Sequence, residues 1–251
     1  MSNLRPHAVV SLNGRLTNPS DAQIPALSSA GLVGRGVFTT IAIIDRKPFL
    51  WEKHWRRLGE GCNRTWIDLS AFSESKTRET LDAVVSANAF DNGRARITFF
   101  FEAAGEPWPY ESERPVSLLI ITGDARPKLQ NPSLTVSPFR INSMSPLSGV
   151  KSCNYLDKIL SIIEARRRRF DEAIQLNERG EVASACMANV FWLRDGVLFT
   201  PSLKSGCLAG TTREFVLENF ECREVEIGLE ELRLADEIFL TSAGLGIIQV
   251  A

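Results

Sequence analysis

Hydrophobic and polar positions in the first half of the chain predict short helices and strands in alternation. Asn-Gly lies between two β-prone runs in residues 9–17, a pattern typical of a hairpin. Apolar runs predict further strands over 37–44, 48–51, 95–101 and 116–122. Helical spacing of apolar residues predicts helices over 52–66 and 74–90.

The second half has the same mixed character. Its clearest helix is predicted over 155–170, where the apolar residues at helical spacing are Leu156, Ile159, Leu160 and Ile163. Another helix is predicted over 211–220. Strands are predicted over 134–141, 172–177, 181–185, 189–193, 197–201 and 237–243.

A segment rich in Gly, Pro and charge separates the two halves. Residues 123–132 lie between two strand-like runs and are the best candidate for a linker. We therefore predict an α+β fold of two domains, a smaller one over 1–122 and a larger one over 133–251.

Composition narrows the classes of protein to which the chain can belong. With 251 residues, 44% hydrophobic residues and a formal net charge of -1, it is typical of a globular protein with a substantial core. This charge gives no support to a nucleic-acid partner or an anionic membrane surface. No signal-peptide pattern or long apolar run is present, so we expect a cytoplasmic protein. Five scattered cysteines and two histidines give no support to a metal site.

Two stretches contain residues that could carry chemistry, and each has a structural alternative. In "LAGTTREF", Thr211 and Thr212 open a helix whose N-terminus suits a phosphate, although a plain helix cap explains the same residues. In "GVKSCNYL", Lys151 lies between apolar segments, where its pKa can be lowered so that it serves as a reactive amine. Most lysines are simply solvated. Gly34 and Gly36 are better explained by a tight entry into a strand than by a dinucleotide site.

Taken in order, the blocks "GRGVFTT", "HWRRL", "GVKSCNYL", "EVASACMANVFW" and "LAGTTREF" resemble the fold-type IV pyridoxal-phosphate enzymes. That family includes branched-chain and D-amino-acid aminotransferases and 4-amino-4-deoxychorismate lyase. The resemblance covers nearly the whole chain. "GVFTT" and "ACMANVFW" are most similar to the lyase branch, and the short spacing from Lys151 to Asn154 is the form shared by the lyases and the D-amino-acid transaminases.

The resemblance implies a homodimer that binds pyridoxal 5'-phosphate in the cleft between its two domains and acts on a small molecule. It implies that Lys151 is the catalytic residue, which bonds to the cofactor and moves the proton. It further implies that Phe38, Thr39 and Thr40 lie on the substrate side. The cofactor-binding residues implied are Arg57, Thr211 and Thr212 for the phosphate, with Lys151, Ser184, Asn189 and Ser242.

The chain departs from the family at Ser184, where a glutamate ordinarily keeps the pyridine nitrogen of the cofactor protonated. Serine is neutral, and its hydroxyl would donate to an unprotonated nitrogen. Glu181 is predicted on the opposite face of the strand and does not replace the missing glutamate. At the phosphate side, Ala243 stands about where the family has a threonine, and Ser242 is adjacent.

Three functions remain after these departures. The serine favours a lyase that forms 4-aminobenzoate and pyruvate, since aromatisation of the product drives that reaction. An aminotransferase, which depends more on the protonated ring, is the first alternative. A degenerate, non-catalytic relative is the second.

Overall fold

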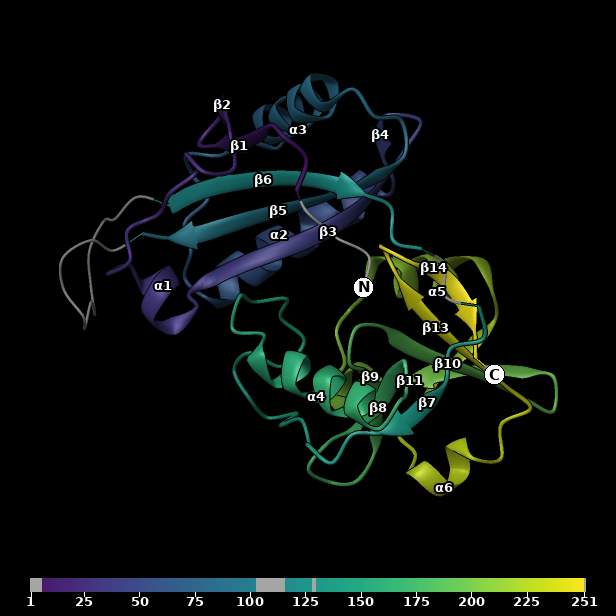
Figure 1. Ribbon diagram of the computed structural model, residues 1–251. Helices are drawn as coiled ribbons and strands as arrows, with labels where there is room; N and C mark the ends of the chain where they lie inside the picture. The colour runs from purple at the N-terminus through teal and green to yellow at the C-terminus, as the bar shows by residue number, and fades with distance from the viewer. Residues whose placement is uncertain (1–5, 103–115, 128–129, 251) are drawn as a thin grey trace. The chain divides into compact units, whose positions relative to one another are not determined.

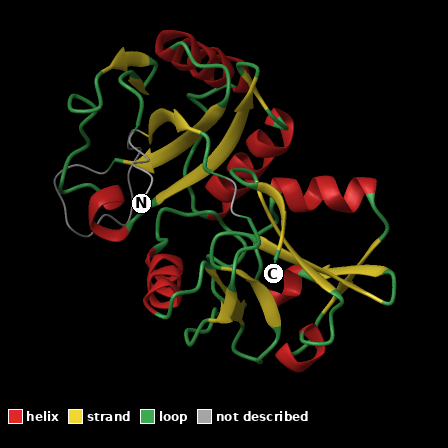
Figure 2. Cartoon of the chain, turned by 45° about the vertical axis from the view of Figure 1, so that its right-hand side comes forward, coloured by secondary structure: helices red, strands yellow, loops and turns green. Residues whose placement is uncertain are grey.

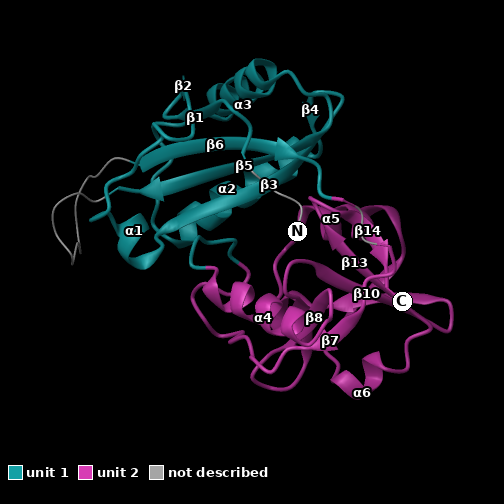
Figure 3. Ribbon diagram, viewed as in Figure 1, with its two compact units in different colours: residues 1–126, 150–154 teal, residues 127–149, 155–251 magenta. Residues whose placement is uncertain are grey.

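The computed structural model describes residues 6–102, 116–127 and 130–250. The chain forms two compact units (Figure 3). Unit 1 contains residues 1–126 together with 150–154, and unit 2 contains residues 127–149 and 155–251. Helices and strands occur in both units (Figure 2), as expected for an α+β protein.

A six-stranded sheet forms the centre of unit 1 (Figure 1). Its strands are β1 (Val10–Leu12), β2 (Arg15–Thr17), β3 (Gly36–Ile44), β4 (Lys47–Pro48), β5 (Gly93–Phe101) and β6 (Val116–Asp124). They follow the order β2-β1-β6-β5-β3-β4, and every neighbouring pair is antiparallel. The three long strands β3, β5 and β6 lie side by side.

Two helices cover one face of this sheet, and the other face is not covered by them. They are α2 (Trp51–Arg64) and α3 (Glu74–Asn88), and a shorter helix α1 spans Ser29–Val33. Leu58 of α2 and Leu81 of α3 belong to one core with the alternate residues of β3 and β5 that point toward the helices. The residues between them, such as Phe38 and Arg96, therefore point to the opposite face.

The segment Val150–Asn154 packs with unit 1 although most of its sequence neighbours belong to unit 2. Its backbone runs beside the first residues of β3. The N–H of Phe38 donates to the carbonyl of Lys151 at 2.9 Å, and the N–H of Cys153 donates to the carbonyl of Gly36 at 2.8 Å. These bonds place Lys151 at the edge of the sheet.

Unit 2 contains two smaller sheets. One follows the order β12-β11-β10-β13-β14, and the other follows the order β7-β8-β9. The strands are β7 (Leu134–Val136), β8 (Glu172–Leu176), β9 (Val182–Ala185), β10 (Asn189–Arg194), β11 (Val197–Pro201), β12 (Cys222–Val225), β13 (Glu237–Ser242) and β14 (Gly246–Gln249). The helices are α4 (Leu156–Arg167), α5 (Thr211–Asn219), α6 (Leu229–Leu232) and a 3-10 turn over Leu203–Ser205.

Most of the predicted elements are confirmed, and one is wrong. The hairpin turns at Asn13 and Gly14, which have φ angles of 53° and 82° and so suit the primed turn of a two-residue loop. Of the strand predicted over 48–51, only Pro48 lies in a strand, the two-residue β4. Instead, Leu50 adopts the left-handed conformation and α2 begins at the next residue.

The helix predicted over 155–170 is formed as α4, but its apolar stripe is not buried within the chain. Leu156, Ile159, Leu160 and Ile163 are 63%, 40%, 47% and 42% exposed. The buried residues of α4 are Ser161, Ile162 and Ala165. Periodicity identified the helix, but it did not identify the face that packs on unit 2.

The division into units differs in two respects from the predicted domains. Strand β6 extends to Asp124, into the predicted linker, and Val150–Asn154 packs with unit 1 rather than with the second domain. Residues 128 and 129 of that linker lie outside the described residues. None of the helices within the described ranges has the length and hydropathy needed to cross a bilayer.

Gly36 gives a test of the packing between β3 and the Lys151 segment. A Cβ at Gly36 would lie 3.0 Å from both the Phe99 carbonyl oxygen and the Cys153 sulfur. We expect Gly36→Ala to lower the free energy of unfolding by about 1–3 kcal/mol, because a β-strand carbonyl cannot give way easily. The urea midpoint at unchanged slope measures this loss.

Gly59 in α2 is the matched control, because a Cβ there would meet nothing within 4 Å. Gly59→Ala should raise stability by up to about 1 kcal/mol through helix propensity. Equal midpoints for the two variants would contradict the close packing at Gly36.

Candidate active site

Lys151 lies against Phe38 at the edge of the sheet in unit 1. Its Nζ is 4.7 Å from the centre of the Phe38 ring, and its carbonyl holds the Phe38 N–H. The residue is half-buried, while Phe38 is 4% exposed. A lysine held beside an aromatic ring in this way is a suitable candidate for a reactive amine.

A chain of hydrogen bonds positions Arg57 close to this lysine. Arg57 Nη2 donates to Thr39 Oγ1 at 2.7 Å, and Thr39 Oγ1 lies 2.6 Å from His54 Nδ1. Since the hydroxyl accepts from Arg57, its own proton is directed at His54 Nδ1, which acts as the acceptor. The guanidinium is thereby fixed from the core side of the sheet.

His54 is kept neutral by its surroundings. The side chain is 1% exposed, and burial lowers the pKa of its imidazole well below 6.5. The nearby positive charges of Arg57 and Lys151 lower this pKa further. A neutral imidazole can accept the Thr39 proton, so the low pKa and the hydrogen-bond chain support each other.

The three residues expected on the substrate side do not share one face of β3. Phe38 and Thr40 point away from α2, whereas Thr39 points toward it and is fully buried against His54. Thr39 therefore differs from the expectation, because strand alternation places its hydroxyl under Arg57. Its role in this geometry is to hold Arg57.

Arg96 joins this group although the sequence patterns did not single it out. Its guanidinium carbon lies 3.6 Å from the centre of the Phe38 ring. It also donates to Thr98 Oγ1 at 3.2 Å and approaches the Cys153 sulfur at 3.9 Å. The signal available in the sequence was the Arg-x-Arg alternation at Arg94 and Arg96, which places two cations on one strand face.

In unit 2, Thr211 and Thr212 occupy the buried first turn of α5, at 2% and 8% exposure. The preceding Gly210 supplies no side chain to cap the helix. A Cβ at Gly210 would collide with Asn189 Oδ1, so only glycine fits there. A helix N-terminus of this kind, with threonines and no capping side chain, suits a phosphate.

Asn189 binds the backbone of the turn that precedes α5. Its Nδ2 donates to the carbonyl of Leu208 at 2.8 Å, and Gly210 N–H donates to the same carbonyl at 2.8 Å. Asn189 also pairs with Thr241 across β10 and β13. The amide therefore shapes the turn before Thr211.

Ser242 lies at the end of β13, half-buried and opposite Gly246. Its neighbour Thr241 is 2% exposed, and the Thr241 hydroxyl has no hydrogen-bond partner among the described residues. A buried hydroxyl without a partner requires an explanation, and a bound group would supply one. Thr241 was missed by the sequence patterns.

Ser184 is 3% exposed and lies beside neutral and cationic groups of unit 2. Its hydroxyl donates to Gln175 Oε1 at 3.5 Å, and Lys158 Nζ donates to the same oxygen at 2.9 Å. Burial lowers the pKa of Lys158. Ser184 and the Lys158 ammonium thus share one acceptor in the pocket wall that the resemblance predicts.

Glu172 of β8 and Glu181, just before β9, are both engaged by other groups. Glu172 accepts from the N–H groups of Ala173 at 3.0 Å, Cys186 at 3.0 Å and Met187 at 3.2 Å, and burial raises its pKa. Glu181 accepts from Arg179 Nη2 at 2.7 Å. Neither carboxylate replaces a glutamate at Ser184.

The residues present fit most of the cofactor that the resemblance implies. Unit 1 brings together Lys151, Phe38, Thr39 and Arg57, which supply an amine for an aldehyde and a guanidinium for a phosphate. Unit 2 separately supplies the Thr211 turn, with its uncapped N-terminus. The one departure is the ring nitrogen, for which Ser184 offers a hydroxyl in place of a carboxylate.

The chain is similar to several known proteins. The family model "Amino-transferase class IV" matches residues 36–251. An aminodeoxychorismate lyase of Bacillus subtilis is 29% identical over 250 residues, which cover 96% of this chain and 85% of that protein. A branched-chain-amino-acid aminotransferase of Escherichia coli is 36% identical over 255 residues, which cover 95% and 82%.

The fold is likewise similar to a solved structure. A branched-chain aminotransferase from Thermoproteus uzoniensis, determined with norvaline, superposes with a TM-score of 0.90 and 28% identity. The similarity covers 97% of this chain and 86% of that one.

The neutral state of His54 predicts how stability depends on pH. Because its pKa is depressed on folding, the unfolded chain binds more protons as the pH falls below about 6.5. Stability should therefore fall with pH in that window, by at most about 1.4 kcal/mol per pH unit from this group. His54→Asn, which keeps an acceptor for Thr39, should lose less stability between pH 7 and pH 5 in urea titrations.

His7→Asn is the control, because it removes a histidine of the same unit that contacts Thr122 and Asp124 and not Thr39. Parallel curves for wild type and His54→Asn would contradict a depressed His54 pKa.

Proposed function

Since this chain belongs to the class IV aminotransferase family, we propose that it is a lyase that forms 4-aminobenzoate and pyruvate from an aminodeoxychorismate-type substrate. The family consists of pyridoxal-phosphate enzymes, so the chain is a lyase or an aminotransferase that uses this cofactor on a small molecule. The observation that carries the lyase assignment is the surroundings of Ser184, whose hydroxyl shares the Gln175 Oε1 acceptor with the Lys158 ammonium.

The chain's own residues supply the following roles in this proposal. Lys151 bonds to the cofactor and moves the proton at the reacting carbon. Arg57, held by Thr39, binds the phosphate, as do Thr211 and Thr212 at the start of α5. Asn189 and Ser242 complete the cofactor-binding set, and Phe38 and Thr40 lie on the substrate side. The bound cofactor supplies an electron sink for the carbon next to the amine.

The Ser184 wall favours elimination over amino transfer for an electrostatic reason. A carboxylate partner keeps the pyridine nitrogen protonated and makes the ring a strong sink, whereas a hydroxyl beside an ammonium does not. Pyruvate elimination is assisted by formation of an aromatic ring and so tolerates a weaker sink. The similarity to the Bacillus subtilis lyase supports the same choice.

The second candidate is an aminotransferase, favoured by the 36% identity to the Escherichia coli branched-chain enzyme. Under either activity we propose the homodimer that the resemblance implies. The exposed apolar stripe of α4 supports it, because such patches mark association surfaces. Sedimentation equilibrium of the purified chain measures this directly.

Borohydride labelling tests the assignment of Lys151. Protein mixed with pyridoxal phosphate and reduced should carry the label on Lys151, and Lys151→Ala should lose it. Lys158→Met is the control, because Lys158 is the other lysine beside a candidate site residue and has a pKa lowered by burial. That variant should keep the label.

Activity assays on the enzyme before reduction with borohydride distinguish a lyase from an aminotransferase. Pyruvate released without a keto-acid acceptor supports the lyase, and amino transfer to a keto acid supports the aminotransferase. A label on Lys158, or on no lysine, would refute the proposed site and favour a non-catalytic protein.

Ser184→Glu tests the electrostatic argument. The new carboxylate would lie beside Gln175 and Lys158, and we expect it to raise amino-transfer activity at least tenfold and to shift the visible spectrum of the bound cofactor. Ser184→Gln is the matched neutral control and should do neither. If the two variants behave alike, the charge at position 184 does not set the reaction.

A further inference from the structure

Lys158 occupies a position of α4 at which an apolar side chain is expected. The buried residues of this helix are Ser161, Ile162 and Ala165. Lys158 precedes them by three, four and seven residues, so it lies on the same face of the helix. The residue is half-buried, and its amine reaches β8 rather than the exposed apolar stripe of α4.

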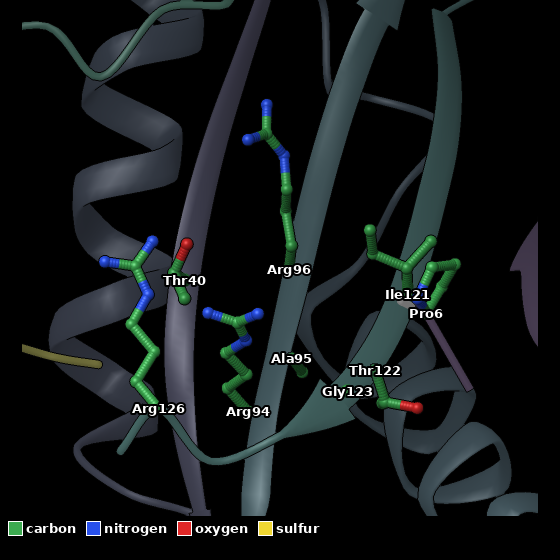
Figure 4. Close-up of a pocket in the computed structure, with 9 residues that line it drawn as sticks. All are labelled: Pro6, Thr40, Arg94, Ala95, Arg96, Ile121, Thr122, Gly123 and Arg126. Carbon is green, nitrogen blue, oxygen red and sulfur yellow. The ribbon is translucent and has the colours of Figure 1, made fainter. Parts of the chain in front are cut away.

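The setting of Lys158 differs from that of the arginines in unit 1. Figure 4 shows Arg94, Arg96 and Arg126 extending around a pocket that they help to line. A side chain that lines a pocket can stay hydrated, whereas Lys158 lies at a contact between a helix and a strand, where burial lowers its pKa. A cation in such a place loses solvation free energy, so a role for its charge is expected.

A hydrogen-bonded network fixes the direction of the Gln175 amide beside Lys158. Ser161 Oγ donates to the carbonyl of Asp157 at 2.9 Å, so it accepts from Gln175 Nε2 at 3.2 Å. The Gln175 Oε1 atom therefore faces the other way, where it accepts from Lys158 Nζ at 2.9 Å. Gln175 is 1% exposed, which keeps water from competing for these bonds.

Ser184 shares the Gln175 oxygen but is held by it only weakly. The two residues pair across β8 and β9, so their side chains project to the same face. The Ser184 hydroxyl lies 3.5 Å from Gln175 Oε1, against 2.9 Å for Lys158 Nζ. A charged donor makes the shorter and stronger bond. The Ser184 proton is therefore available to an acceptor that is better placed than Gln175.

Neighbouring carboxylates favour the ammonium form of Lys158. Two carboxyl groups and two thiols raise its pKa against the larger effect of burial, namely Asp157, Glu172, Cys186 and Cys207. Burial raises the pKa of both thiols, so they are neutral near pH 7. Of these four groups, the two carboxylates therefore supply the negative charge that the ammonium requires.

We propose that Lys158 is a positioning residue that keeps the nitrogen of a bound pyridine ring unprotonated. Its charge disfavours a second cation in the same surroundings. Its bond to Gln175 leaves the Ser184 hydroxyl available to donate to the ring nitrogen. The ligand class is thus a neutral pyridine with an acceptor nitrogen, not a pyridinium. This inference rests on the proposed function for its claim that the ring belongs to pyridoxal phosphate.

Nitrogen-15 NMR at neutral pH tests this proposal on protein loaded with pyridoxal phosphate that is labelled at the ring nitrogen. Free labelled pyridoxal phosphate, above and below its ring pKa, supplies the two reference signals. We expect the wild type to give the unprotonated signal. Lys158→Met should move it at least halfway to the protonated signal, because Ser184 can then donate to Gln175 and accept from the ring.

Two control variants separate the charge of Lys158 from its packing. Lys204→Met makes the same substitution at an exposed lysine of unit 2, and it should leave the unprotonated signal unchanged. Ser161→Ala removes another hydrogen bond of Gln175 but keeps Lys158, and it should do the same. Lys158→Gln is the second neutral variant if Lys158→Met does not fold. An unchanged signal in either folded Lys158 variant would overturn the proposal.

Borohydride labelling and activity assays on the same preparations separate this inference from the proposed function. A protonated ring in a wild type that is labelled on Lys151 and releases pyruvate overturns the inference and leaves the lyase standing. An unprotonated ring in an enzyme that only transfers amino groups supports the inference and refutes the lyase. Absence of both the bound ring signal and the Lys151 label overturns both.

Discussion

The pairing of the Lys151 segment with the edge of β3 is the constraint on which the rest of unit 1 depends. Two backbone hydrogen bonds join residues that are far apart in the sequence, Phe38 to Lys151 and Cys153 to Gly36. They place an amine, an aromatic ring and the Arg96 guanidinium in contact. Gly36 permits this approach because a side chain there would meet the Cys153 sulfur.

Sequence patterns predicted the turns, strands and helices that depend on neighbouring residues. They missed the contacts between residues that are far apart in the sequence. The Asn13–Gly14 turn, the long strand β3 and the helix α4 follow from neighbouring residues, and all three are formed. The buried face of α4 could not be predicted, because periodicity reveals a stripe but not what covers it. Likewise, "FTT" was read as one group, whereas strand alternation directs Thr39 to the opposite face from Phe38 and Thr40.

The candidate site was predicted by resemblance, and its supporting residues were not. His54, Arg96, Lys158 and Thr241 were not expected as site residues, although His54 lies inside the block "HWRRL". Lys158 illustrates the reason. Lys158 lies on α4, whereas Gln175 and Ser184 lie on β8 and β9, which follow α4 in the chain. Only the folded unit brings these side chains within hydrogen-bond distance.

Val150–Asn154 packs with unit 1 but lies within the sequence of unit 2, and this limits how the chain can be cut into separately expressed fragments. A fragment that ends at Arg126 would retain all six strands of the sheet but would lack the segment that covers the first residues of β3. An uncovered strand edge presents unpaired backbone groups to other molecules and promotes aggregation. A separately expressed unit 1 therefore needs these five residues joined to it. We expect a fragment that simply ends at Arg126 to aggregate.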